Sequence, residues 1–286
     1  MAYTTVRGGR IRYEILGSGP SLVLTPGMRN GMDNVRPMAE RLAAHYRVII
    51  YDRRNTGGSD VAFEGPSEQE MWAEDQYALL DELGALPAYV LGISVGAGAS
   101  LAMTLAHPGA VRALVLAWVT GGEFPRDRLA RDLYGQFVDA ALAGGMAAVA
   151  DTAFFRARSA DNPGVREQLL AWDPDRFVVR MRTWEQAFCA PGPIPPVPRV
   201  ALARAGLAMP ILVIAGDDEI HLEPAARAVH ELLPGSEYQP PLLTREEWES
   251  LGAPAPKNHP DRHRAIAEYR GIHVPPVIHA FLERCR

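Results

Sequence analysis

Hydrophobic positions in the first 120 residues follow two different periods. Ile11, Tyr13 and Ile15 alternate with charged residues, which predicts a strand with one face in water. Four short, continuous apolar runs then recur, and stretches with helical spacing separate them; the runs lie at 21–25, 47–51, 89–93 and 113–119. A strand that is covered on both faces has such a continuous apolar run. The pattern therefore predicts an α/β protein whose mainly parallel sheet carries helices on both faces.

The pattern changes after residue 121. From there to about residue 206 the apolar residues keep helical spacing, as in Leu129, Leu133 and Phe137, without a convincing buried strand. A further strand pattern returns at 211–215. We therefore predict one sheet domain formed by 1–121 and 207–286, with an inserted helical domain at 122–206, a size within the usual range for a domain.

Composition and charge restrict the class of protein. The chain has 286 residues, 48% of them hydrophobic, and 29 basic against 34 acidic side chains give a net charge of −5. This apolar content excludes a disordered chain, and the mild acidity without a basic run argues against nucleic acid or an anionic membrane as partner. Two cysteines, Cys189 and Cys285, are too few for a disulfide framework. With no long apolar stretch and no leader pattern, we expect a cytoplasmic protein.

The sharpest chemical feature is the segment 92–96, Gly-Ile-Ser-Val-Gly, between a predicted buried strand and a helix rich in small residues. A serine in so tight a strand-to-helix turn is strained, and glycines on both sides avoid collisions with strand and helix. The turn presents the Ser94 hydroxyl at the carboxyl edge of the sheet, beside the free N–H groups of the helix N-terminus. Ser94 is therefore the predicted nucleophile.

With this turn and a second one, the sequence resembles the α/β-hydrolase superfamily. The segment 52–60, Asp-Arg-Arg-Asn-Thr-Gly-Gly-Ser-Asp, is similar to the family's D-x-R-G-x-G-x-S loop, with Asn55 at a glycine position. Pro26-Gly27 stands where the family usually has His-Gly. The resemblance covers 6–121 and 209–235, and implies an α/β-hydrolase fold with an inserted helical cap at 122–206. It also implies an oxyanion hole made by the backbone N–H groups of Met28 and Val95.

The family's order of catalytic residues is serine, acid and then histidine, which places the acid after the strand at 211–215. Three adjacent candidates follow Gly216 there. The family acid commonly lies two or three residues after such a glycine, which favours Asp218, with Glu219 second and Asp217 third. His221 comes too early for the family base, and we interpret it as a loop packing residue.

The base is expected on a loop shortly before the last helix, and four histidines lie in that region. His259, at a loop-to-helix junction, is favoured, and His273 is the alternative. His279 belongs to the apolar pattern of the last helix and is predicted to be structural, and His263 falls inside a short helix. Although His259 and His263 have a metal-binding spacing, no paired motif lies nearby, so no metal is predicted.

Aromatic residues are frequent in the predicted cap, and part of them is expected to line an apolar pocket over Ser94. Trp118, just after a predicted strand, and Arg29, beside the oxyanion loop, are the predicted substrate-binding residues. No metal or organic cofactor is implied. A homodimer is one expectation for the assembly.

These residues predict a serine hydrolase that cleaves a small, apolar carboxylic ester, lactone or vinylogous C–C bond through a Ser-His-Asp triad. One alternative is a cofactor-free non-hydrolytic enzyme, a lyase, oxygenase or perhydrolase, that uses the same pocket. Another is a non-catalytic small-ligand receptor on this fold, because fold alone does not determine function. Its mark would be a missing member of the triad.

Overall fold

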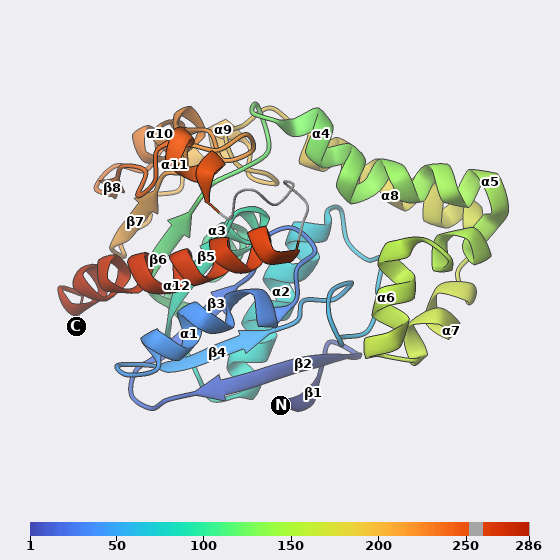
Figure 1. Cartoon of the computed structure of the whole chain (residues 1–286), viewed down its shortest axis with the longest axis horizontal. Coiled ribbons are helices and arrows are strands. Elements are labelled where there is room, and N and C mark those ends of the chain that lie inside the picture. The colour runs from blue at the N-terminus through green and yellow to red at the C-terminus, as the bar shows by residue number, and fades with distance from the viewer. Residues whose placement is uncertain (252–259, 286) are drawn as a thin grey trace.

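The computed structural model describes residues 1–251 and 260–285. Within these residues, eight strands form one sheet in the order β1-β2-β4-β3-β5-β6-β7-β8 (Figure 1). The strands are β1 (Ala2–Val6), β2 (Gly9–Leu16), β3 (Ser21–Thr25), β4 (Arg47–Tyr51), β5 (Ala88–Ile93), β6 (Val111–Ala117), β7 (Ile211–Ile214) and β8 (Glu237–Gln239). Among the described strand pairs of this sheet, β1–β2 and β2–β4 are antiparallel and the other five are parallel. The predicted mainly parallel sheet is thereby confirmed.

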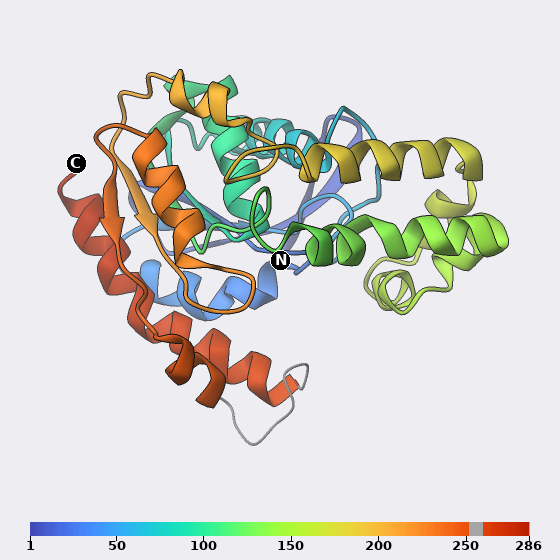
Figure 2. The ribbon, with the colours of Figure 1, turned by 90° about the horizontal axis from the view of Figure 1, so that it is seen from above.

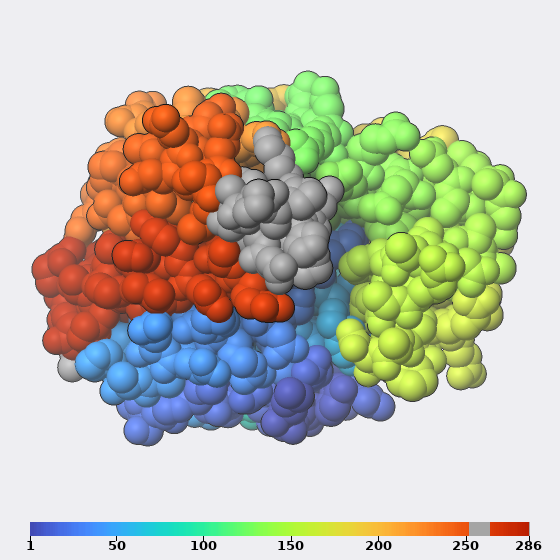
Figure 3. Space-filling model, in the orientation of Figure 1, coloured from blue at the N-terminus to red at the C-terminus, as the bar shows by residue number. Residues whose placement is uncertain are grey.

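Helices cover both faces of this sheet, as the continuous apolar runs require. One face carries a core into which α1 (Arg36–Leu42) and α12 (Pro260–Glu283) insert side chains such as Met38 and Ile278. These two helices lie side by side on the face that Figure 3 shows. The other face packs against α2 (Glu68–Glu82), α3 (Val95–Ala106) and α10 (Glu223–Leu232). Three short helices complete this part: η1 (Met32–Val35), η2 (Pro108–Ala110) and α11 (Arg245–Ser250).

Between β6 and β7 the chain leaves the sheet and forms a group of helices. They are α4 (Arg126–Ala130), the π-helix η3 (Arg131–Gly135), α5 (Gln136–Ala150), α6 (Ala153–Asp161), α7 (Gly164–Leu170), α8 (Pro174–Phe188) and α9 (Arg199–Ala203). Most of this group extends away from the sheet (Figure 2). Its apolar core includes Phe137, Phe155 and Trp184, and continues into Val95 and Trp72 of the sheet part. The division into a core domain and a cap domain at 122–206 stays a prediction.

The inserted helices are anchored on the loop that follows β4. Buried Arg158 of α6 donates hydrogen bonds to the carbonyl oxygens of Gly57 and Ser59. Asn162, at the end of the same helix, donates to the Asp60 carboxylate at 3.1 Å. These bonds join the inserted helices to the loop that resembles the family motif at 52–60.

The stretch 126–161 is the one candidate membrane-spanning helix among the described residues, by length and mean hydropathy alone. In the structure it is not a straight helix, because Gly144 and Gly145 have non-helical backbone angles and Asp151 ends α5. Phe137, Val149 and Phe155 of this stretch lie in the core of the inserted helices. The expected absence of a membrane partner stays a prediction.

Candidate active site

Ser94 occupies the turn between β5 and α3 in a strained conformation. Its backbone angles are φ 56° and ψ −123°, a region that side chains rarely adopt. Its N–H donates to the carbonyl oxygen of Ala117 in β6 at 2.9 Å, which ties the turn to the sheet. A side chain at position 96 would collide with the carbonyl oxygen of Pro26, and one at position 92 would lie 2.6 Å from Cα of Ala97. The two glycines are therefore required for this sharp turn.

The Ser94 hydroxyl is hydrogen-bonded to His221. Nε2 of His221 lies 2.9 Å from Oγ of Ser94, and Nδ1 lies 2.7 Å from Oδ2 of Asp218. All three side chains are largely removed from water. A serine next to an imidazole that a carboxylate orients is the arrangement of an activated nucleophile. The interpretation of His221 as a mere packing residue is therefore wrong.

The two histidines favoured from the sequence do not take this place in the described structure. His273 is exposed on α12, and its ring stacks on Tyr269 with the centroids 4.1 Å apart. His259 lies outside the described residues. His279, predicted to be structural, accepts or donates a hydrogen bond at Nδ1 with the Tyr46 hydroxyl and stacks on His45. Of the described histidines, only His221 contacts Ser94.

Asp218 folds the loop so that a histidine only three residues later reaches the serine. Its Oδ1 accepts hydrogen bonds from the backbone N–H groups of Ile220 at 2.9 Å and of His221 at 2.8 Å. An aspartate that binds the N–H groups ahead of it forms a tight turn of its own. The second oxygen, Oδ2, then binds the imidazole. One carboxylate thus shapes the loop and orients the ring.

The same contacts keep Asp218 ionised. Burial by itself would raise the pKa of this carboxyl. The imidazole of His221 and the two N–H donors more than offset burial, and hold the pKa of Asp218 well below its usual range. The carboxylate can therefore accept a hydrogen bond from Nδ1 throughout the neutral pH range.

The neighbouring acids are bound to other parts of the chain. Asp217 accepts hydrogen bonds from the backbone N–H and the guanidinium of Arg245, at 3.0 and 3.3 Å. Glu219 forms an exposed ion pair with Arg128 of α4 at 3.1 Å. Among the described contacts, Asp218 is the only one of the three that reaches His221. The Asp-x-x-His spacing is the sequence signal that could have identified the pair. His221 was rejected because the family's base usually lies later in the chain.

The loop after β3 passes directly beside Ser94. A side chain at position 27 would lie 2.7 Å from Cβ of Ser94, and Met28 has a φ of 40°. Nη2 of the buried Arg53 donates to the carbonyl oxygens of Gly27 and Met28, at 3.2 and 2.6 Å. Burial lowers the pKa of Arg53 to about 10. Val95 begins α3, where an N–H group has no partner within the helix. Met28 and Val95 thus stay the proposed oxyanion donors.

The structure gives Arg29 a different use from the predicted substrate contact. Its Nη1 lies 2.6 Å from Oε1 of Glu68, and its Nη2 donates to the carbonyl oxygen of Leu133 at 2.8 Å. Phe137 and Phe154 face the guanidinium, with centroids 5.4 and 5.6 Å away. Arg29 therefore joins the loop after β3 to α2 and to the π-helix. A π-helix commonly marks a functional region, because it changes which carbonyl groups are free.

Replacing Arg29 should cost stability because it leaves the buried Glu68 carboxylate without its cation. We expect Arg29→Met to lower the free energy of unfolding in urea by about 3–5 kcal/mol. Arg166→Met is the matched control, since its 2.7 Å pair with Asp151 is about half exposed on both sides and should matter by less than about 1 kcal/mol. The double variant Arg29→Met/Glu68→Met should lose less than Arg29→Met alone. Equal losses for Arg29→Met and Arg166→Met would refute this account.

Trp118 lies beside the hydrogen-bonded trio. It follows β6 with a φ of 53°, and its N–H donates to the carbonyl oxygen of Ile214 at 2.8 Å. A side chain at position 216 would lie 2.8 Å from the Trp118 ring and 2.7 Å from Cβ of His221. The indole and Cβ of His221 therefore both lie beside Gly216, and a contact of Trp118 with substrate stays a proposal. The described residues contain no cluster of three or more metal-binding side chains.

Comparison with known proteins places this geometry among similar folds. A family model described as the alpha/beta hydrolase fold matches residues 20–135. An uncharacterised hydrolase of Bacillus subtilis is 36% identical over 112 residues, which cover 38% of this chain and 41% of that protein. A 2-hydroxymuconate semialdehyde hydrolase of Pseudomonas putida is 35% identical over 111 residues, 39% of this chain and 37% of that one. The matches thus span less than half of these relatives.

A solved structure extends the similarity to the whole fold. The enol-lactonase from Burkholderia xenovorans LB400 superposes with a TM-score of 0.64 at 20% identity, over 99% of this chain and all of that one. At this identity the likeness concerns the fold. The α/β-hydrolase fold expected from the sequence is confirmed. The residues of the site stay candidates, and the case for them rests on their own geometry.

Proposed function

We propose that this chain, which belongs to the α/β-hydrolase superfamily, is a serine hydrolase with Ser94, His221 and Asp218 as its triad. The observation that carries the proposal is the continuous hydrogen-bonded chain from the Ser94 hydroxyl through both nitrogens of His221 to Asp218. The receptor alternative required a missing member of the triad, and this chain of contacts argues against it.

The geometry supports a two-stage reaction. Oγ of Ser94 attacks the substrate carbonyl while Nε2 of His221 takes the hydroxyl proton, and Asp218 stabilises the resulting imidazolium. The N–H groups of Met28 and Val95 bind the oxyanion. His221 then gives its proton to the leaving group, which departs and leaves an acyl group on Ser94. Water attacks this acyl group with His221 as base, and the acid product and the free serine are released.

The substrate class follows from what surrounds the serine. The apolar core of the inserted helices includes Val95, the neighbour of Ser94 in the sequence, and Met28 and Ile220 pack against this core. Such a wall favours a small apolar acyl compound. The enol-lactonase and the 2-hydroxymuconate semialdehyde hydrolase support the same range. We propose a small ester, a lactone or a vinylogous C–C bond, because each is cleaved after attack on a carbonyl.

A fluorophosphonate probe tests whether Ser94 is an activated nucleophile. The native full-length chain should be labelled at Ser94, because the probe reacts with serines that a base deprotonates. Labelling should vanish in Ser94→Ala and after heat denaturation. Ser236→Ala is the control, since this serine is hydrogen-bonded to His230 far from the strained turn and its loss should leave labelling unchanged. An unlabelled native protein, or equal labelling of Ser94→Ala, would rule the proposal out.

A further inference from the structure

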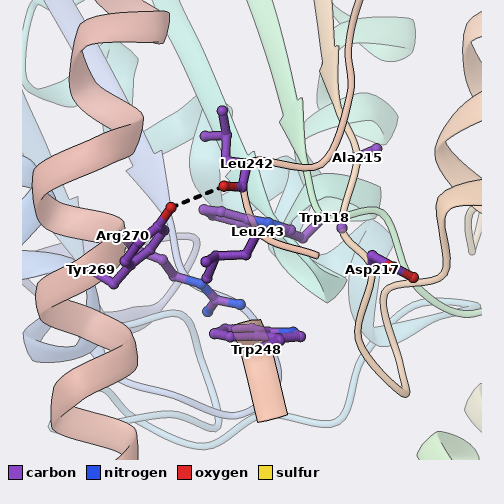
Figure 4. Close-up of a pocket in the computed structure, with 9 residues that line it drawn as sticks. Trp118, Ala215, Asp217, Leu242, Leu243, Trp248, Tyr269 and Arg270 are labelled. Atoms are coloured by element: carbon purple, nitrogen blue, oxygen red, sulfur yellow. Dashed lines mark hydrogen bonds between the residues drawn. The ribbon is translucent and has the colours of Figure 1, made fainter. Parts of the chain in front are cut away.

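A small cavity lies close to the proposed triad, and it contains a cationic side chain that the proposed reaction does not use. It is lined by Trp118, the segment 215–217 after β7, Leu242 and Leu243 after β8, Trp248 on α11 and Arg270 on α12. Its volume is small, about 20 Å³, and the cavity opens to solvent, so a larger ligand would lie partly at its mouth. Residues that are far apart in the sequence converge on it (Figure 4).

Arg270 is the cation of this cavity, and two indoles hold it. Its guanidinium carbon lies 4.3 Å from the ring centroid of Trp118 and 5.0 Å from that of Trp248 (Figure 4). Stacking of this kind orients a guanidinium and leaves the N–H groups at its edge free to donate. The side chain is thus fixed in place before any ligand arrives.

No described carboxylate neutralises Arg270. Asp217, the acid that lines the cavity, is bound by Arg245 and points away from Arg270 (Figure 4). Nε of Arg270 is buried without a hydrogen-bond partner in the described structure. Burial lowers the pKa of Arg270 to about 10, and the charge of Asp218 offsets part of that effect. The side chain as a whole is half-buried. A cation that is partly removed from water and has no described counter-ion is costly, so the cavity favours an anion.

We propose that this cavity is a binding site for the carboxylate of a small organic acid, with Arg270 as its anchor. The two parallel N–H groups on the edge of a guanidinium match a planar carboxylate, which they bind through two hydrogen bonds. Leu242 and Leu243 offer contacts to a short apolar body. A single arginine suits a monoanion better than a doubly charged phosphate.

The site adjoins the triad, so its occupation bears on the reaction. Gly216 lies close both to the indole of Trp118, which covers Arg270, and to Cβ of His221, so the cavity and the proposed triad meet at this glycine. The carboxylate has two sources, namely the substrate or its acid product, or a separate acid that affects the enzyme. Binding itself does not depend on the proposed function, whereas the kinetic arm below does.

Titration of the full-length protein with sodium acetate and sodium butyrate tests the site, followed by calorimetry and by tryptophan fluorescence. We expect saturable binding that Arg270→Met weakens at least tenfold, because the charge is lost while a similar volume stays. Arg227→Met is the matched control: Arg227 also stacks on a ring, that of Tyr238 at 4.9 Å, but Glu223 already binds it at 2.6 Å. The affinity of the Arg227→Met variant for acetate and butyrate should equal that of the wild type. Equal binding by Arg270→Met, or equal binding of chloride or butanamide, would overturn the proposal.

Trp248→Leu is a second variant that tests the site even if Arg270→Met does not fold. Trp248 lies on α11, a short exposed helix, so its replacement should disturb the fold little. It should weaken butyrate binding several-fold with an unaltered thermal unfolding curve, and unchanged affinity would count against the site. In the kinetic experiment, which rests on the proposed function, we expect butyrate to inhibit hydrolysis of a p-nitrophenyl ester. Competitive inhibition that Arg270→Met abolishes assigns the site to substrate or product, and non-competitive inhibition assigns it to a separate acid. Absence of ester hydrolysis with intact butyrate binding would refute the proposed function and leave the site standing.

Discussion

His221→Ala should lower kcat/KM for a small ester by a factor on the order of 10³–10⁴. Without the imidazole, nothing in the described structure takes the proton from Ser94, and a neutral serine is a weak nucleophile. The fold should survive, because the ring lies at the carboxyl edge of the sheet rather than in its core. Steady-state kinetics with a p-nitrophenyl ester measure the loss, and circular dichroism checks the fold.

Two other histidine variants make this result specific. His273→Ala should keep kcat/KM within about twofold, since its ring is exposed on α12 against Tyr269. His259→Ala tests the position favoured by the sequence, and it should likewise retain activity. A loss of activity in His259→Ala together with an active His221→Ala would return the base to its expected place late in the chain and contradict our assignment.

Asp218→Asn should lower kcat/KM on the order of 10²–10⁴-fold, because an amide presents Nδ1 of His221 with the wrong charge and favours the wrong tautomer. Glu219→Gln and Asp217→Asn are matched controls with the same chemical change. They should stay within about threefold, since Arg128 and Arg245 bind these acids away from the imidazole. A larger loss in Glu219→Gln than in Asp218→Asn would reassign the acid.

The Asp218→Asn variant should also show that part of the protein's folding stability depends on pH. The pKa of Asp218 in the folded state lies below its unfolded value, so its ionised form stabilises the fold above about pH 4. This contribution is lost as the pH falls through the lowered pKa. The difference in unfolding free energy between the wild type and Asp218→Asn should therefore be largest near neutral pH and shrink in acid. Urea unfolding at several pH values measures it, and a difference that grows on acidification would contradict the assigned shift.

Local patterns were enough to predict the sheet and the strained turn that holds Ser94. The strands β3 to β6 are short apolar runs because both of their faces are covered, and a run of this kind can be recognised without knowing the fold. The turn at Ser94 could be recognised because its strained geometry depends on glycines two residues before and after the serine. Both signals come from neighbours in sequence, where the chain itself sets the distances.

The acid could be ranked but not chosen from the sequence. Asp217, Asp218 and Glu219 have similar chemistry and adjacent positions, so only their partners distinguish them. Those partners are Arg245 on α11 for Asp217, the His221 ring for Asp218 and Arg128 on α4 for Glu219. Two of these come from distant segments, whose approach depends on how α4 and α11 pack.

The partners of Arg29 could not be predicted from the sequence either. Its place beside the oxyanion loop suggested a substrate contact, but Glu68 and the Leu133 carbonyl oxygen use its donors. Leu133 is more than a hundred positions further along the chain, and its approach follows from the packing of the inserted helices.

The sequence by itself determined the order of strands and helices and the sharp turn at Ser94, because these depend on backbone geometry over a few residues. The short list of acids followed from the resemblance to the family. Only the tertiary structure decided that His221 faces Ser94, that Arg29 holds Glu68, and that Arg270 stands in a cavity without a described counter-ion. The physical reason is that hydrogen bonds and ion pairs act over about 3 Å. Whether two groups come that close is settled by packing of the whole chain.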